Sequence, residues 1–225
     1  MQRIVASDFE TTATPPALGE DELHLWLFER PPGLSPRAMS ALAHAELGRL
    51  LGAYAGNTEP PALARDTHGK PFALDGGHPH FNLSHGGERI ALAFARRHAV
   101  GVDVETAHRR AAPLDLATRF FAGDEARALS GIDDAEALHA AFVDLWTCKE
   151  AVLKALGRGL AFGLDRLRFE LDRDGPRALA EIAAEAGHVS DWHVARFDAG
   201  GAHAGAVAWR GDALRVRAFR AGARL

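Results

Sequence analysis

The chain has 225 residues, 47% hydrophobic and 25% charged, a composition ordinary for globular proteins and a length sufficient for a substantial core. Its formal net charge of −4 argues against a dedicated nucleic-acid binder, which is usually basic. The single cysteine, Cys148, excludes an intrachain disulfide, and the lack of an apolar signal core or of an apolar run of about 18 residues predicts a cytoplasmic protein without a membrane span.

The first half of the chain predicts a strand, a helix and a hairpin. The opening 20 residues are polar and contain prolines, so we expect an irregular segment. Glu22–Glu29 alternates apolar and polar residues, which predicts a strand. Ser35 is a suitable N-cap for a helix over Pro36–Tyr54. Residues 57–79 predict a loop with room for one short strand. A hairpin follows, with its strands and turn at residues 81–83, 89–95 and 84–87.

The second half begins with a predicted strand at Val100–Glu105. Two helical stretches, residues 114–121 and 123–129, precede a long helix from Asp134 to Leu156, which Gly157 ends. Residues 177–186 fit no single element type. Four further strands are predicted at Arg166–Leu171, Trp192–Phe197, Ala204–Trp209 and Ala213–Phe219.

Both halves therefore contain a strand, a helix and further strands. This order predicts an α+β protein. We place the boundary in the stretch that follows Glu105. This divides the chain into an N-terminal α+β half, residues 1–108, and a C-terminal α+β half, residues 109–225.

The strand at residues 100–105 places Gly101, Asp103 and Glu105 on one face and its valines on the other. Two carboxylates about 6–7 Å apart along a strand are costly unless a cation or hydrogen-bond donors neutralise them. One interpretation is a solvated strand face. The other is a site for Mg²⁺, which binds carboxylates, water and phosphate oxygens.

The long helix carries two of the only three lysines among the 26 basic residues of the chain. Its buried stripe consists of Leu138, Phe142, Leu145, Val152 and Leu156. Lys149 lies in line with this stripe, while Glu150 and Lys154 are i,i+4 neighbours on the adjoining face. A snorkelling lysine and a surface ion pair are the simple alternatives. Lysine is a compact charge with freely directed donors, however, and its use beside Glu150 favours a phosphate-and-metal site.

Other candidate sites are weaker. The spacing of His78, His80 and His85 matches no common zinc pattern. Ser84 and His85 lack the G-x-S-x-G elbow of a hydrolase, and the chain has neither a P-loop nor a G-x-G-x-x-G motif. Cys148 is typical of a packed helix cysteine.

Together these segments resemble the 4′-phosphopantetheinyl transferase superfamily, in its larger, surfactin-synthetase-activating type. The resemblance covers roughly residues 68–165, and the ordered set of motifs is specific although each motif is short. The motifs are Gly69-Lys70-Pro71; Phe81-Asn82-Leu83-Ser84-His85; Gly101-Val102-Asp103-Val104-Glu105; Arg119-Phe120-Phe121 with Glu125; and the run from Trp146 to Gly157.

The resemblance implies transfer of phosphopantetheine from coenzyme A to a serine of an apo acyl or peptidyl carrier protein, with release of 3′,5′-ADP. It implies that Asp103, Glu105 and Glu150 bind Mg²⁺, which holds the pyrophosphate. Glu150 is the family's usual candidate for the general base towards the carrier serine. Lys154 would contact phosphate, with Lys149 as a helper.

The resemblance also places Ser84 and His85 towards the coenzyme A phosphates, and Lys70 and Pro71 along its adenine side. His85 joins Glu150 and Lys154 as a catalytic candidate. The implied architecture is a pseudo-twofold pair of α+β halves with the active site at their interface. Such internal duplication makes a monomer the expected state.

One feature departs from the family pattern. The family usually has a longer, arginine-rich helix before the first loop, whereas residues 34–54 are short and His44 stands where an arginine is expected, with Arg37 and Arg49 nearby. The alternative function is therefore a coenzyme A or carrier-protein binding protein with the same fold and weak or no turnover. The third possibility is a structural protein in which the motifs occur by chance.

The resemblance also implies an acceptor surface around Phe120–Leu129.

Overall fold

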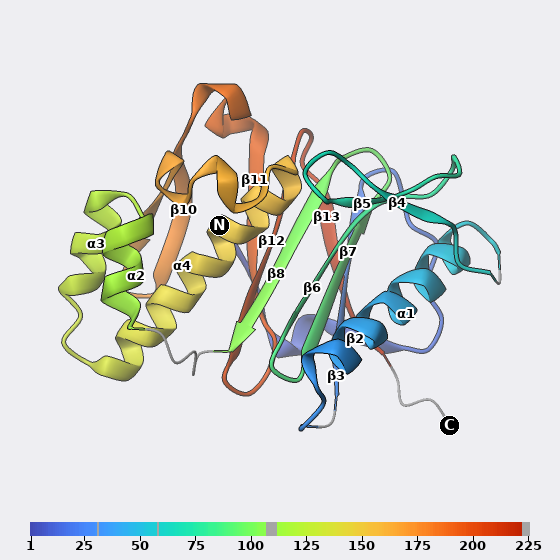
Figure 1. Cartoon of the computed structure of the whole chain (residues 1–225), viewed down its shortest axis with the longest axis horizontal. Helices are drawn as coiled ribbons and strands as arrows, with labels where there is room; N and C mark the ends of the chain where they lie inside the picture. The colour runs from blue at the N-terminus through green and yellow to red at the C-terminus, as the bar shows by residue number, and fades with distance from the viewer. Residues whose placement is uncertain (31, 58, 107–111, 222–225) are drawn as a thin grey trace.

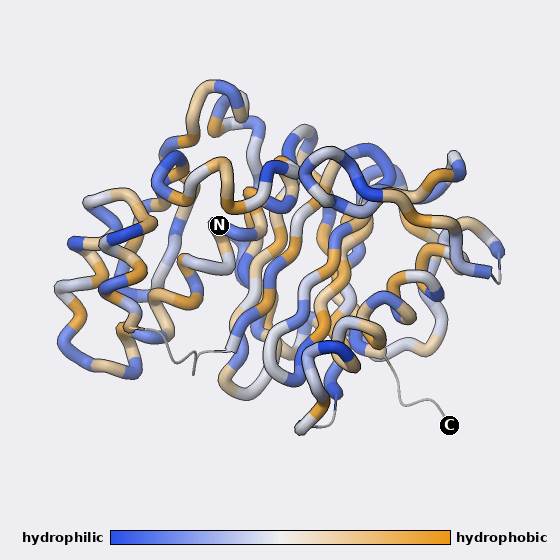
Figure 2. Tube along the Cα trace, viewed as in Figure 1, coloured by the Kyte–Doolittle hydropathy of each residue, from blue (hydrophilic) through white to orange (hydrophobic). Residues whose placement is uncertain are grey.

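Two β-sheets pack face to face, and each carries a helix on its outer face (Figure 1). The computed structural model describes residues 1–30, 32–57, 59–106 and 112–221. The layers follow the order helix, sheet, sheet, helix, so the predicted α+β class is confirmed. Hydrophobic residues follow the strands and the inner helix faces, while the loops are mostly hydrophilic (Figure 2).

The five-stranded sheet is covered by α1 (Pro36–Tyr54). Its strand order is β2 (Phe9–Thr12), β13 (Arg215–Ala221), β3 (Glu22–Glu29), β7 (Arg89–Ala95) and β6 (His80–Gly86). Neighbouring residues of β3 face opposite sides, as strand geometry requires. Leu25 packs against the second sheet, whereas Trp26 packs against α1.

The four-stranded sheet is covered by α4 (Ala135–Leu156). Its strand order is β1 (Gln2–Ile4), β11 (Trp192–Asp198), β12 (His203–Arg210) and β8 (Val100–Thr106). The valines of β8 pack between the two sheets, so the opposite face of β8 is turned towards α4.

Smaller elements surround these layers. The helices α2 (Pro113–Phe120) and α3 (Gly123–Ser130) and the hairpin of β9 (Leu167–Asp172) and β10 (Gly175–Ile182) pack around α4. A short hairpin of β4 (Leu63–Arg65) and β5 (Pro71–Ala73) lies beside β6. The 3-10 turns are Ala6–Asp8, Gly159–Phe162, Leu164–Arg166, Ala184–Ala186 and Val189–Asp191.

Local signals predicted the helix ends well. The Ser35 hydroxyl accepts a hydrogen bond from the Ala38 N–H, with an Oγ–N distance of 3.2 Å, so the predicted N-cap is confirmed. Asp134 caps α4 in the same way. Gly157 ends α4 with a φ of 77°, a backbone conformation that favours glycine.

Three expectations need correction. The opening residues are not irregular, because β1 pairs with β11 and β2 pairs with β13, strands that are distant in the sequence. The predicted turn at residues 84–87 is shorter, because β6 continues through Gly86. Residues 177–186, which fitted no single element type, lie largely in β10, which pairs with β9.

The sheets exchange strands between the two parts of the chain. The expected boundary at residue 108 falls within 107–111, outside the described residues. β8 comes before it but pairs with β12, and β13 comes after it but pairs with both β2 and β3. Neither sheet is therefore built from one continuous half. Among the described residues, no helix is long and apolar enough to cross a membrane.

A buried polar network stabilises the face of β3 that packs on α1. His24 is fully buried, with Nδ1 2.8 Å from the Tyr54 hydroxyl and Nε2 3.2 Å from Glu22 Oε2. The Trp26 indole N–H donates to the same hydroxyl at 2.8 Å. A neutral ring with its proton on Nε2 satisfies every contact. Burial lowers the pKa of His24 to about 4, although Glu22 partly offsets this effect.

This network predicts acid destabilisation. In the unfolded chain His24 takes up a proton below pH 6.5, whereas the folded protein resists protonation down to about pH 4, so stability is lost as pH falls through that window. The expected loss is about 3 kcal/mol. Urea unfolding at pH 7 and pH 4 measures it. His24→Gln should lose less stability by about that amount, and equal losses in both proteins would contradict the assignment.

Candidate active site

The candidate site lies where the edge strands of the two sheets meet. β6 ends one sheet, β8 ends the other, and the two strands lie side by side (Figure 1). Asn82 Oδ1 of β6 accepts a hydrogen bond from the Val102 N–H of β8 at 2.9 Å. Ser84 Oγ donates to Asp103 Oδ1 at 2.8 Å. Side chains of β6 thus satisfy polar groups on β8 where a partner strand is missing.

Helix α4 packs directly onto β8 because residue 101 is glycine. A Cβ at Gly101 would lie 2.1 Å from the Ala151 carbonyl oxygen and 2.3 Å from the Ala155 nitrogen. The helix runs opposite to the strand (Figure 1). Two residues along a strand span about 7 Å, a little more than one helical turn, so Asp103 lies level with the turn that contains Glu150.

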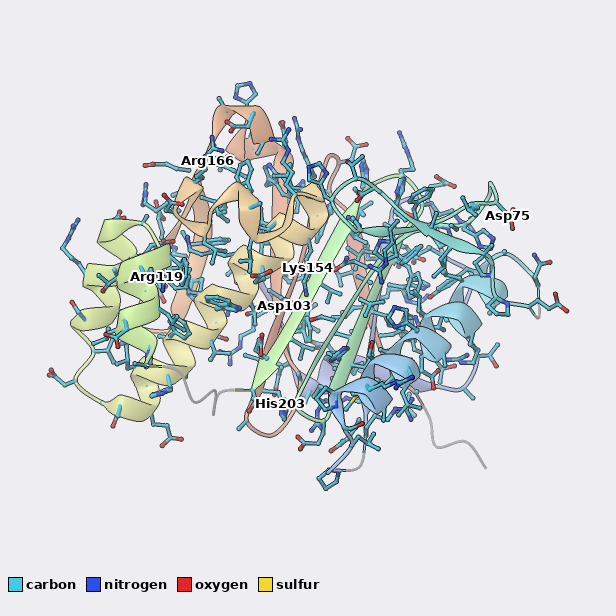
Figure 3. The ribbon with its side chains drawn as sticks, viewed as in Figure 1. Asp75, Asp103, Arg119, Lys154, Arg166 and His203 are labelled. Carbon is cyan, nitrogen blue, oxygen red and sulfur yellow. The ribbon has the colours of Figure 1, made fainter. Side chains whose placement is uncertain are left out.

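Lys154 and Asp103 form the centre of the site (Figure 3). Lys154 Nζ lies 2.7 Å from Asp103 Oδ1 and donates to Ser84 Oγ at 2.9 Å and to the Val102 carbonyl oxygen at 3.1 Å. The Lys154 side chain is 26% exposed, so part of it can be reached from solvent. Asp103 Oδ2 is buried and has no hydrogen-bond partner within the described ranges. A buried carboxylate oxygen without a partner is costly, which makes it a suitable ligand for a cation.

The predicted metal ligands Asp103, Glu105 and Glu150 are not gathered into a closed cation site. Within residues 1–30, 32–57, 59–106 and 112–221, no three His, Cys, Asp or Glu side chains are arranged to hold a metal ion. Instead, Oδ1 of Asp103 is paired with Lys154 Nζ at 2.7 Å. The residue types nevertheless fit Mg²⁺, which needs only one or two carboxylates besides water and phosphate, and the partnerless Oδ2 of Asp103 supports this fit.

Lys70 and Pro71 lie beside the C-terminal end of α4, along a cavity of about 490 Å³. Lys70 Nζ donates to the carbonyl oxygens of Val100 at 3.1 Å, Lys154 at 2.7 Å and Ala155 at 3.3 Å. A cation at this end also interacts favourably with the helix dipole. Burial nevertheless lowers the pKa of Lys70 to about 8.

His85 lies on β6, next to Ser84, and is half-buried. Burial lowers its pKa, and the nearby charge of Lys154 and the His44 ring lower it further. His44, where an arginine was expected, lies on α1 with Nδ1 2.8 Å from the Ser40 carbonyl oxygen. Arg49, the basic neighbour, is paired with Glu46 at 3.0 Å.

Lys149 is not part of this group. Its side chain is fully buried, and its ammonium lies 2.7 Å from Glu125 Oε2, enclosed by the protein. The expectation that Lys149 contacts a bound phosphate is therefore wrong, and so is the snorkelling alternative. Burial lowers the pKa of Lys149, while the charge of Glu125 raises it.

Two features of the site were not predicted. Asn82 had no assigned role, although it shares the period-2 face of β6 with Ser84 and this spacing was a usable signal. The anchoring of Lys70 on the carbonyl groups of α4 joins residues 84 positions apart, and no sequence pattern indicates such a contact.

The close approach at Gly101 yields a steric prediction. Gly101→Ala should destabilise the protein by ~1–3 kcal/mol, because the added Cβ forces α4 away from β8. Denaturant unfolding measures the change. Gly131→Ala is the control, because its Cβ would meet nothing nearer than 3.5 Å, and its effect should stay within about 0.5 kcal/mol. Equal stability of both variants would show that the contact is not tight.

Comparisons with known proteins identify relatives of this chain. The sequence model of the 4′-phosphopantetheinyl transferase superfamily matches residues 99–208, the segment that includes β8, α4 and most of β12. The 4′-phosphopantetheinyl transferase HetI of Nostoc sp. strain PCC 7120 is 31% identical over 195 residues, which cover 73% of this chain and 80% of that protein.

The 4′-phosphopantetheinyl transferase psf-1 of Bacillus pumilus is 36% identical over 128 residues, which cover 56% of this chain and 52% of that protein. The chain spans about half the length of the curated Bacillus relatives that it matches. Among solved structures, the holo-[acyl-carrier-protein] synthase of Thermotoga maritima aligns with 52% of this chain and 64% of that one, at 24% identity and a TM-score of 0.40.

Proposed function

The chain belongs to the 4′-phosphopantetheinyl transferase superfamily, and we propose that it transfers the phosphopantetheine group of coenzyme A to a serine of an apo acyl or peptidyl carrier protein. The transferase activity for which HetI and psf-1 are named supports this proposal. The observation that carries the proposal is the pairing of Lys154 with Asp103 at the meeting of the two sheets. A reachable cation beside a partnerless carboxylate oxygen suits a substrate that brings both phosphate and a metal ion.

The cavity at the end of α4 would hold the nucleotide end of coenzyme A. Its volume of about 490 Å³ lies within the range of small-molecule sites. Pro71 and Phe72 line one side, Lys70 supplies a positive charge, and Leu156 and Gly157 close the helical end. The cavity therefore combines apolar walls with a cation, a combination that suits a base joined to phosphates.

The phosphates would extend from this cavity along α4 to Lys154. Lys154 would exchange part of its contact with Asp103 for a phosphate oxygen, an exchange that its partly exposed side chain supports. His85 lies close enough to Lys154 for the ammonium charge to lower the pKa of His85. This proximity supports a place for His85 beside the same phosphates. The neutral ring that its lowered pKa favours would act as a hydrogen-bonding group rather than as a second cation.

Asp103 would hold Mg²⁺ through its partnerless Oδ2, with Glu105 and Glu150 as further ligands. When bound, the ion would neutralise charge on the pyrophosphate and on the departing 3′,5′-ADP. Ser84 would keep Asp103 oriented through the hydrogen bond to Oδ1.

In the reaction, the carrier serine oxygen would form a bond to the phosphorus next to the pantetheine arm. The bond from that phosphorus to the bridging oxygen would break, and 3′,5′-ADP would leave with the electron pair. Glu150 would accept the serine proton, directly or through water. Lys154 would offset the charge that develops on the phosphates.

The acceptor would dock on α2 and α3. Phe120, 37% exposed, is a large apolar residue on this surface. We further propose that the two helix-covered sheets reflect a pseudo-twofold pair of halves, which the placement of α1 and α4 on opposite outer faces supports. Such a protein would act as a cytoplasmic monomer.

The direct test is incubation with coenzyme A, Mg²⁺ and a panel of apo carrier proteins. We expect a mass gain of one phosphopantetheine on a carrier serine, which mass spectrometry detects. Folded protein that modifies no carrier but binds coenzyme A by calorimetry would instead favour the alternative, a binding protein without turnover.

The charged pair yields a second expectation. Asp103→Asn should lower kcat by about 100-fold or more, because it removes a metal ligand and the partner of Lys154. Lys154→Met should give a loss of similar size. Asp133→Asn, which removes an exposed carboxylate at the far end of α4, is the matched control and should leave steady-state rates unchanged. If Asp103→Asn and Lys154→Met had the same kcat as Asp133→Asn, the Lys154–Asp103 pair would have no role in the reaction.

A further inference from the structure

A second lysine of α4 is enclosed on another side of the helix from the candidate site. Lys149 Nζ lies 2.7 Å from Glu125 Oε2, 2.8 Å from the Leu164 carbonyl oxygen and 2.5 Å from that of Leu167. These contacts use all three protons of the ammonium group. The Phe121 ring covers it further, with its centroid 5.0 Å away.

Glu125 is equally enclosed, with 1% exposure, and connects three elements. Its Oε1 accepts a hydrogen bond from the Phe169 N–H at 2.8 Å, and Oε2 accepts one from the Ala122 N–H at 3.0 Å. The carboxylate therefore joins the start of α3 and strand β9 to the ammonium of α4. Charged groups so fully removed from water must be held in a fixed geometry, because any displacement leaves a buried charge unpaired.

Net stabilisation is a weak explanation for this pair. Buried ion pairs often contribute no more to stability than well-packed apolar side chains of the same volume, because desolvation offsets the attraction. The pair instead supplies directional contacts, because the acceptors of Lys149 lie on three different elements: α3, β9 and the turn before β9. Apolar packing has no preferred direction, whereas these hydrogen bonds constrain the rotation of α4 about its axis.

The rotation of α4 determines where the site residues point. Glu150 follows Lys149 directly, and Lys154 lies five residues further along the same helix. Side chains end about 6 Å from a helix axis, so a rotation of about 10° moves them by about 1 Å. A misplacement of about 1 Å is enough to cost about 100-fold in rate in an enzyme site.

We propose that Lys149 and Glu125 form a positioning pair, which sets the rotation of α4 so that Glu150 and Lys154 face Asp103. The pair also connects this helix to α3, part of the surface proposed for the acceptor. This inference rests on the proposed function for its kinetic consequence, but its structural consequence is independent of any activity.

The test uses the double variant Lys149→Met with Glu125→Gln in the full chain. Both charges are removed together, so no unpaired buried charge remains, and the glutamine oxygen can still accept from the Phe169 N–H. We expect kcat per coenzyme A-binding site, counted by calorimetry, to fall by about 10–100-fold, with a smaller rise in the Kd for coenzyme A, because Lys154 would also contact its phosphate. A purely structural role would reduce the number of binding sites and leave the rate per site unchanged.

A second measurement needs no catalysis. The chain has only three lysines, so lysine side chains labelled with ¹³C at Cε give three signals in an NMR spectrum. We expect the Lys154 signal to shift in the double variant, because its ammonium no longer lies in the same relation to Asp103. Glu22→Gln with Arg215→Met is the matched control, since it removes another ion pair with a buried carboxylate, on the five-stranded sheet, and should leave the Lys154 signal in place.

The outcomes separate the two proposals. An unchanged Lys154 signal together with an unchanged rate per site would overturn the positioning pair while the proposed function stands. Absence of transfer by the unsubstituted protein on every carrier would overturn the proposed function, and the Lys154 signal would still decide the pair. A shift of that signal in the control variant as well would also count against the pair, because the response would not be specific to it.

Discussion

The free edge of β8 is the constraint on which the rest of the site depends. An edge strand carries backbone N–H and C=O groups that lack a neighbouring strand, and those that are buried must find partners. Here Asn82 accepts from the Val102 N–H, and the ammonium groups of Lys154 and Lys70 bind the Val102 and Val100 carbonyl oxygens. The side chains that bind the backbone groups of the β8 edge are thus the same ones that form the polar site. A substitution of any of them would therefore affect both the fold and the site.

All three lysines of the chain bind groups that hold α4 in place. Lys154 binds it to β8, Lys149 binds it to α3 and β9, and Lys70 binds the carbonyl groups at its end. In each case one ammonium group meets three acceptors that point at it from different directions. A guanidinium is planar and directs its donors in a fixed fork, so arginine could not make these contacts in the same space. The arginines serve mostly at the surface, where exposed ion pairs add little.

The elements that follow local rules could be predicted from the sequence. The alternation in Glu22–Glu29 and the N-cap at Ser35 mark a strand and a helix without reference to distant residues. The face shared by Gly101 and Asp103 also follows from strand period alone, and it places both residues towards α4. What could not be predicted depends on distant partners.

The remaining features show this dependence. The pairing of β1 with β11 decides that the opening residues form a strand, and no local pattern carries that information. Lys149 fits the apolar stripe of α4 by spacing, yet its acceptors come from Glu125 and from a turn after the helix. The position of Lys149 was therefore correct while its role was wrong, because spacing specifies a face and says nothing about what lies opposite.

The strand exchange has a consequence for how the protein is made. β13 lies between β2 and β3, so the sheet that begins near residue 9 stays incomplete until residues 215–221 have left the ribosome. β8 must likewise wait for β12, about 100 residues later. The early strands thus keep open edges while about 200 further residues are made, and open edges favour aggregation. The five-stranded sheet can be completed only after β13 has been made, so a truncation that removes β13 affects the sheet that contains the early strands β2 and β3.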